Sequence, residues 1–258
     1  MIPEIGVLRD VAHAAADAAR AVTLRHFRTP IDIDSKDAGF DPVTVADREA
    51  EAAMRAVIRD RRPDDGILGE EAARVEGASG LTWVLDPIDG TRGYISGTPT
   101  WGTLIGLRDV ARVRYGLIDQ PFTGERFEGP EPLWSRGDER RTLAVRGTTE
   151  LSAATILTTY PEVGTAAQHG AFRRLSDRCR LTRYGMDCYG YALLAAGCVD
   201  LVVEAGLHPY DIVAPIGVVE AAGGVVTSWE GGPALDGGTA LAAATPELHA
   251  AAMRVLDA

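Results

Sequence analysis

Two carboxylates at the end of one apolar run are the residues of this chain best placed to do chemistry. Asp86 and Asp89 follow the apolar residues 83–85 and precede Gly90 and Thr91. The run predicts a buried strand, and the proline and glycine around the aspartates predict that the strand stops there in a turn. Carboxylate oxygens beside the backbone N–H groups of a turn suit a hard divalent cation and an anion bound side by side.

Further acidic residues stand where predicted elements begin or end. Glu70 and Glu71 close a short apolar strand, and two strand ends that both present carboxylates could meet around one cation cluster. Asp47 lies near the start of a predicted helix, and Asp211 lies just before another. Each also has a simpler interpretation: a charged loop for the glutamates, and a helix-dipole or capping residue for the aspartates.

Composition and charge narrow the class of partner. The 258 residues are enough for one large domain or two modest ones. A content of 46% hydrophobic and 24% charged residues is typical of a soluble globular protein. The net charge of −11 argues against nucleic acid and anionic membranes, which need a basic surface. A phosphorylated small molecule stays compatible, because bound metal ions reverse the local field.

The cysteines and the N-terminus favour a cytoplasmic protein. Cys179, Cys188 and Cys198 are odd in number and form no CxxC pair, so neither a disulfide framework nor a zinc site is expected. The N-terminus carries acidic residues and no long apolar core, unlike a signal peptide. No stretch approaches the ~20 apolar residues of a membrane span.

The elements that must position the acids are predicted from periodicity. Apolar residues at helical spacing predict helices over 4–28 and from Thr44 onward. A short strand is expected near 31–36. Farther along, alternation predicts a hairpin that includes 101–107 and 113–118, followed by another short strand that ends at Gly129.

The composition turns polar between residues 130 and 150, which predicts a boundary between two subdomains, residues 1–140 and 141–258. The charge cluster at 136–141 is interpreted as a solvated loop. Beyond it, the patterns predict strands at 151–159, 199–205, 225–229 and 239–244, and helices at 166–179, 187–196, 212–222 and 246–256.

Together these motifs resemble the inositol monophosphatase family of metal-dependent phosphatases. Residues 83–91, WVLDPIDGT, are similar to the family signature, and DPVTVAD at 41–47 and GEE at 69–71 resemble two more motifs in the same order. The last acidic motif, usually Trp-Asp, is Tyr210-Asp211 here. The resemblance covers nearly the whole chain. It implies the family fold, an α+β (α/β) structure layered as an αβαβα sandwich with two subdomains.

A narrower resemblance is to the histidinol-phosphate phosphatases of this family. Residues 98–105, 116–121, 184–189 and 199–204 are similar to that subfamily. The resemblance implies a phosphoric monoester hydrolase that converts L-histidinol phosphate to L-histidinol in histidine biosynthesis. The alternatives are an inositol-1-phosphate or sugar-phosphate monophosphatase and, disfavoured by the complete acidic set, a non-catalytic metal-binding regulatory protein.

The family resemblance also implies a site for two or three Mg²⁺ ions. Glu70, Asp86 and the Ile88 carbonyl would hold one ion, and Asp86, Asp89 and Asp211 a second. A third, weaker ion would lie near Glu70, which therefore counts among the catalytic residues. Mg²⁺ prefers oxygen ligands and keeps several waters, and a water whose pKa is lowered by the metal is the expected nucleophile.

Catalytic and phosphate-binding roles are implied by the same resemblance. Thr91 and Asp47 would orient and deprotonate the attacking water. The N–H groups of Gly90 and Thr91 would bind phosphate oxygens, as helix-start donors do. Asp211, which also counts among the substrate-binding residues, would lie near a water on the second metal that could protonate the leaving alkoxide.

Substrate choice is expected at Asp187 and Glu204, which match family positions facing the organic half of the substrate. Histidinol phosphate carries an ammonium group and an imidazole, which pair favourably with two carboxylates, whereas inositol needs only hydroxyl partners. Glu204 alone also fits a solvated strand-end acid. Arg183, Tyr94 and Lys36 are further candidates. The expected partner is thus a small-molecule phosphate monoester, and neither nucleic acid nor a membrane is expected. The resemblance also implies a homodimer, which is common in the family.

Overall fold

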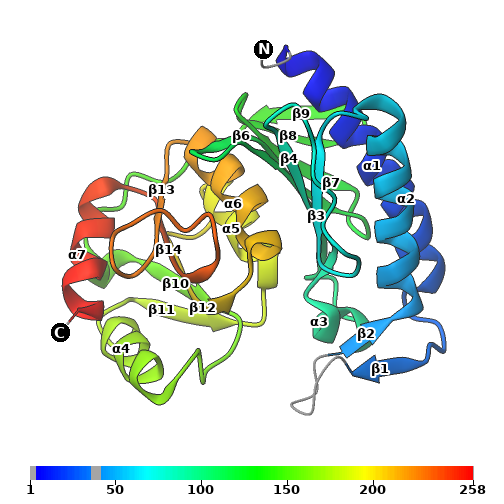
Figure 1. Cartoon of the computed structure of the whole chain (residues 1–258). Coiled ribbons are helices and arrows are strands. Elements are labelled where there is room, and N and C mark those ends of the chain that lie inside the picture. Colours follow the sequence, from blue (N-terminus) through cyan, green and yellow to red (C-terminus); the bar gives the residue numbers. More distant parts are fainter. Residues whose placement is uncertain (1–3, 36–41, 258) are drawn as a thin grey trace.

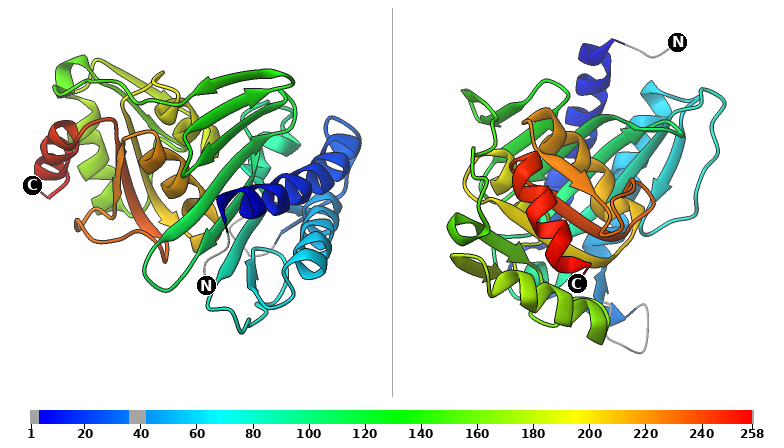
Figure 2. Two further views of the ribbon diagram at one scale, coloured as in Figure 1. Left: turned by 90° about the horizontal axis from the view of Figure 1, so that it is seen from above. Right: turned by 90° about the vertical axis from the view of Figure 1, so that its left-hand side faces the viewer.

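The chain folds into five layers in which helices and sheets alternate (Figure 1). The computed structural model describes residues 4–35 and 42–257, so Lys36 and Asp41 lie outside the described residues. Seen from above in Figure 2, α7 (Pro246–Leu256) lies at one end, and α1 (Ile5–His26) and α2 (Val45–Arg61) lie at the other. Both sheets stand between them. The predicted αβαβα sandwich is confirmed.

The outer layer formed by α1 and α2 follows from its sequence pattern. The buried residues of α1 recur every three or four positions from Leu8 to Ala19, which gives the helix one apolar face. Thr44 caps α2 by accepting a hydrogen bond from a backbone N–H of the first turn at 3.1 Å. Both helices pack on the first sheet, around Ile58 and Trp83. Between them, β1 (Ile33–Ser35) and β2 (Pro42–Thr44) pair antiparallel.

The first sheet contains seven strands in the order β3-β4-β5-β6-β7-β8-β9. Only β3 and β4 are parallel among these neighbours, and parallel pairing brings their C-terminal ends to one edge. That edge is where Glu70 and Asp86 lie. The strands are β3 (Gly66–Gly69), β4 (Thr82–Asp89), β5 (Gly102–Arg108), β6 (Val113–Gln120), β7 (Glu125–Gly129), β8 (Leu133–Arg136) and β9 (Glu139–Thr142).

Two features of this sheet correct the sequence prediction. The charge cluster at 136–141 is not a loop, since most of it lies in the β8–β9 hairpin, with β9 fully exposed. Charged side chains suit such an edge because they discourage pairing with another chain. In addition, β4 does not stop at Pro87 but continues to Asp89. Pro87 falls in a register shift, where its missing N–H breaks no ladder bond.

The second sheet has the order β11-β10-β12-β14-β13. Its edge strand β11 was not predicted, because its four residues are largely exposed and leave no apolar pattern. The first half of the strand predicted at 151–159 is instead a 3₁₀ turn, residues 151–153. The remaining elements are β10 (Thr155–Thr158), β11 (Leu181–Tyr184), β12 (Leu201–Leu207), β13 (Val225–Thr227), β14 (Gly238–Ala243), α3 (Thr91–Ile95), α4 (Ala166–Ser176), α5 (Asp187–Ala195) and α6 (Pro209–Ala221).

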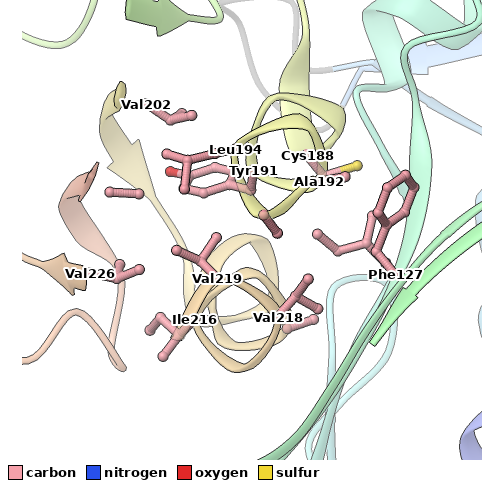
Figure 3. Close-up of a cluster of buried hydrophobic side chains, with 14 of the residues drawn as sticks. Phe127, Cys188, Tyr191, Ala192, Leu194, Val202, Ile216, Val218, Val219 and Val226 are labelled. Carbon is pink, nitrogen blue, oxygen red and sulfur yellow. The ribbon is translucent and has the colours of Figure 1, made fainter. Parts of the chain in front are cut away.

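The central layer consists of α5 and α6, packed between the two sheets. Figure 3 shows Tyr191 and Leu194 of α5 facing Val219 of α6 in this core. α6 lies unusually close to the first sheet at Gly116, where a Cβ would lie 2.4 Å from the Ala214 carbonyl oxygen. Within the described residues, no helix has the length and apolar character needed to cross a membrane.

Candidate active site

A pocket of about 430 Å³ opens where the edges of the two sheets face each other. Residues at the C-terminal end of β4, and residues that directly follow β3 and β4, line one side of it. Residues of β12, of the loop after β10, and of the starts of α5 and α6 line the other side. The lining includes nine of the ten site residues predicted from the sequence: Glu70, Asp86, Ile88, Asp89, Gly90, Thr91, Asp187, Glu204 and Asp211.

A bulge at the end of β4 brings Asp86 and Asp89 together. Side chains of a regular strand alternate between faces, so residues three apart would point to opposite sides. Here Asp86 pairs with Leu104 and Asp89 with Gly102, which places one extra residue in β4 and restores both carboxylates to one side. The Ile88 N–H donates to Asp86 Oδ1 at 2.9 Å within the bulge.

Asp211 reaches the same place from the second half of the chain. It is the third residue of α6, whose N-cap is His208 rather than Asp211. The His208 backbone N–H donates to Asp211 Oδ2 at 2.7 Å, so this carboxylate caps the helix from inside its first turn. Oxygens of Asp86, Asp89 and Asp211 all lie within 4.8 Å of one another.

The electrostatics of this cluster favour a bound cation. Burial, and then repulsion from Glu70, Asp89 and Asp211, raises the pKa of Asp86 well above its usual range. Burial and Asp211 raise the pKa of Asp89 to about 7. Like charges this close disfavour ionisation, whereas several carboxylate oxygens around one point are the donor set of a hard divalent cation. The residues present therefore fit a hard divalent cation.

Glu70 and Glu71 have different positions, although the sequence presents them as a pair. Glu70 follows β3 directly and lines the pocket, where its charge raises the pKa of Asp86. Glu71 is not among the lining residues, and its backbone N–H donates to Glu51 Oε2 at 2.7 Å. One acid of the pair thus faces the site, while the backbone of the other is fastened to α2.

Asp47 and Thr91, predicted to work as a pair, belong to two different helices, α2 and α3. Asp47 is buried behind the pocket and accepts hydrogen bonds from the Thr44 backbone and hydroxyl at 2.8 and 2.6 Å. Burial is the main cause that raises its pKa, and nearby Glu70 adds to it. The Thr91 hydroxyl lines the pocket and donates to the Ile88 carbonyl at 3.1 Å.

Asp187 and Gly90 meet where α3 and α5 begin. Gly90 has a left-handed φ of 83°, and a Cβ there would lie 2.8 Å from the Asp187 carboxyl carbon. Only glycine satisfies both conditions. Asp187 itself has a φ of 46°, a conformation that Asp and Asn tolerate better than most residues. Burial and then Asp89 raise the pKa of Asp187 to about 7.

Glu204 forms a buried part of the pocket wall on β12, not a solvated strand end. Its Oε1 accepts hydrogen bonds from the Thr159 N–H at 2.8 Å and from the Thr159 hydroxyl at 3.0 Å. Burial raises its pKa to about 8 despite these donors. Asp187 and Glu204 are therefore two acids in one pocket, both held where a positive charge would stabilise them.

The structure adds lining residues that sequence reasoning gave no role. Arg92 lies with its guanidinium 5.0 Å from the ring centre of Tyr160, and His208 stacks on Tyr210. Polar residues at the end of the strand predicted at 151–159 were the available signal for Thr159 and Tyr160. The further candidates Tyr94 and Arg183 are not among the lining residues. Tyr94 is buried, and Arg183 lies on β11.

The chain is similar to known proteins over nearly its whole length. Residues 6–258 match the inositol monophosphatase family. The chain is 42% identical over 225 residues to the chloroplastic bifunctional phosphatase IMPL2 of Arabidopsis thaliana, and the match covers 86% of this chain and 64% of that protein. It is 33% identical over 234 residues to a histidinol-phosphatase of Chlorobaculum parvum, covering 89% and 88%. An inositol monophosphatase structure from Zymomonas mobilis aligns with a TM-score of 0.82 at 35% identity, covering 96% and 97%.

Proposed function

Because the chain belongs to the inositol monophosphatase family, we propose that it is a Mg²⁺-dependent phosphomonoesterase that hydrolyses L-histidinol phosphate to L-histidinol and phosphate. The family supports the phosphatase activity. The substrate is proposed from one observation, the two carboxylates in the pocket wall, of which Glu204 is buried and Asp187 is half-buried. The likeness to histidinol-phosphatases supports the same choice.

The metal would be held by the clustered acids. Asp86, Asp89 and Asp211 supply oxygens that lie within 4.8 Å of one another, and Glu70 and the Ile88 carbonyl are the further oxygen donors in the pocket. When bound, Mg²⁺ supplies positive charge for the phosphate oxygens and lowers the pKa of a water to generate the nucleophile.

Residues of the chain would position the phosphate and the attacking water. The first N–H groups of a helix lack intrahelical acceptors, and Gly90 and Thr91 stand at the start of α3, so their N–H groups are suited to phosphate oxygens. The Thr91 hydroxyl, held at the Ile88 carbonyl, is suited to orient the water. Asp47 has a raised pKa and would accept the proton from behind the pocket wall.

The organic half of the substrate would lie toward the second sheet. Burial raises the pKa values of Asp187 and Glu204. The ionised form of each carboxyl group is therefore disfavoured in the empty pocket. An ammonium group beside them would favour their ionised forms and form charge-assisted hydrogen bonds. A neutral polyol would add no positive charge to that of Arg92, whose guanidinium already lowers the pKa of Asp187. A cationic amino alcohol is therefore the better fit.

Asp187→Asn tests this assignment without disturbing the backbone. Asn tolerates the left-handed φ of this position, so the substitution removes the charge alone. A hydrogen bond to a charged group contributes about 1.5–3 kcal/mol. We therefore expect kcat/KM for L-histidinol phosphate to fall roughly 10–100-fold, and kcat/KM for inositol 1-phosphate to change much less. Equal losses for both substrates would show that Asp187 does not select a cationic alcohol.

Hydrolysis of inositol 1-phosphate is a second candidate function. The solved relative from Zymomonas mobilis is named an inositol monophosphatase, and it is 35% identical over nearly the whole chain. The same metal and phosphate residues would serve either substrate. The two candidates differ only at the wall formed by Asp187 and Glu204, so their relative rates measure the role of that wall.

A further inference from the structure

Glu51 and Arg55 form a buried ion pair one helical turn apart on α2. Arg55 Nε lies 2.6 Å from Glu51 Oε1, and the two side chains are only 6% and 1% exposed. Residues four apart share one face of a helix, so Glu51 lies on the same face as Asp47. Buried ion pairs stabilise a fold poorly compared with apolar residues of similar size. This pair therefore calls for an explanation beyond packing.

The pair fastens the segment that follows β3. Glu51 accepts hydrogen bonds from the N–H groups of Glu71 at 2.7 Å and Ala72 at 3.1 Å. Arg55 donates to the carbonyls of Ala72 at 2.8 Å and Ala73 at 3.1 Å. Four hydrogen bonds thus join three consecutive residues to α2.

In the chain, Glu70 lies between the first sheet and the three residues that are hydrogen-bonded to α2. It follows the last residue of β3, Gly69, and the loop beyond Glu71 is solvent-exposed from Ala72 to Arg74. A Cβ on Gly69 would lie 2.4 Å from Glu51 Oε1, so Glu51 packs directly on the backbone before Glu70 as well as bonding after it. Without these contacts, a pocket-lining acid would stand at the start of an exposed loop, and such loops are mobile.

We propose that Glu51, together with Arg55, is a positioning residue that fixes the Glu70 carboxylate against Asp86 for divalent-cation binding. This inference depends on the proposed metal-dependent function, although not on the identity of the substrate. Residues that orient metal ligands from outside the ligand set typically contribute 10–100-fold to metal affinity.

Glu51→Gln tests the inference through metal binding. Gln has the same shape but replaces one of the two acceptor oxygens by an NH₂ donor, so that the side chain can no longer accept from the N–H groups of both Glu71 and Ala72. Calorimetric titration of Mg²⁺ into the substrate-free protein should give a Kd about tenfold or more above wild type. Phosphate release should recover substantially at saturating Mg²⁺. Arg55→Lys, which keeps the charge but loses the two-carbonyl fork, should raise the Kd in the same direction.

Asp65→Asn is the matched control. Asp65 is also buried and accepts from Arg62 at 2.8 and 2.9 Å and from Trp83 Nε1 at 2.9 Å, but it precedes β3 at the end away from Glu70. The Asp65→Asn substitution should lower Tm while leaving the Mg²⁺ Kd unchanged. A Glu51→Gln protein that loses Tm but keeps the wild-type Kd would overturn the inference.

Two further results are decisive. If Glu51→Gln does not fold, Arg55→Lys decides the question, because an unchanged Kd in that variant overturns the positioning role. A wild-type protein that does not bind Mg²⁺ would contradict the proposed function itself.

Discussion

Four carboxylates of the pocket lie where ionisation is unfavourable in the empty protein. The pKa is raised in each of these groups, which are Asp86, Asp89, Asp187 and Glu204. Burial is the largest cause of the raised pKa in each case, and neighbouring acids add to it. At this scale the pocket is suited to positive charge, which the proposed function supplies as a metal ion at one end and an ammonium group at the other. The same feature makes the stability of the ligand-free protein depend on pH.

Glu204 allows the sign of this dependence to be tested. Its pKa is raised from 4.5 to about 8 in the fold, so between these values the folded state holds a proton that the unfolded state has lost. Its contribution to stability is then full below the unfolded pKa and is lost as pH rises through the folded pKa. A difference of one bound proton is worth about 1.4 kcal/mol per pH unit, or roughly 3–6 °C in Tm for a chain of this size.

We therefore expect Glu204→Gln to flatten the fall in Tm between pH 5 and pH 8, measured in a chelator without substrate. In this variant Tm should still fall with pH, but less steeply than in the wild type, because the pKa values of Asp89 and Asp187 are also raised, each to about 7. Glu162→Gln, in an exposed loop, should leave the slope unchanged. Parallel curves for wild type and Glu204→Gln would contradict the account of this residue.

Residue types in the site could be predicted from the sequence, but their environments could not. The strand-end acids were recognised because carboxylates after apolar runs form a local pattern. Three features depend on elements far away in the chain: the burial of Glu204, the left-handed φ of Asp187 and the hydrogen bond from the Glu71 N–H to Glu51. In the sequence, Glu51 resembles any helix-surface acid.

At the scale of elements, the site depends on how closely α6 approaches the first sheet. Gly116 makes this approach possible, because a Cβ there would lie 2.4 Å from the Ala214 carbonyl oxygen and 3.0 Å from the Gly217 Cα. α6 carries Asp211 in its first turn. The helix must therefore lie flat on the sheet for Asp211 to meet Asp86 and Asp89.

Gly116→Ala should consequently weaken both the fold and the metal site. Overpacking of this kind typically costs about 1–3 kcal/mol, so Tm should fall by several degrees by calorimetry, and the Mg²⁺ Kd should rise as Asp211 shifts. Gly147→Ala is the control, since a Cβ at Gly147 meets nothing within 4 Å. A Gly116→Ala protein with wild-type Tm and Mg²⁺ affinity would show that close packing of α6 does not position Asp211.

Elements with a buried face were predicted well, and those without one were not. The helices α1, α2, α4 and α7 follow their apolar periodicity. The exposed strands β9 and β11 carry no such pattern, so most of β9 was interpreted as a solvated loop and β11 was not predicted. The bulge in β4 was missed because Pro87 was expected to end the strand, whereas the register shift accommodates it.

At the scale of the whole molecule, the pocket forms only when the two sheets are assembled. Asp86 and Asp89 come from the first sheet, Glu204 from the second, and Asp211 from the helix between them. Periodicity alone could not bring together residues more than a hundred positions apart, and the family resemblance supplied that link. In the proposed function, the metal ligands therefore come from the end of the first sheet and from α6, and the substrate-selecting acids come from α5 and β12.

The ratio of kcat/KM for L-histidinol phosphate to kcat/KM for inositol 1-phosphate, measured on the wild-type protein at saturating Mg²⁺, tests this account most directly. Charge-assisted hydrogen bonds of about 1.5–3 kcal/mol at Asp187 and Glu204 predict a preference for histidinol phosphate of roughly tenfold or more. A ratio of one or below would contradict the assignment of the acidic wall to a cationic alcohol.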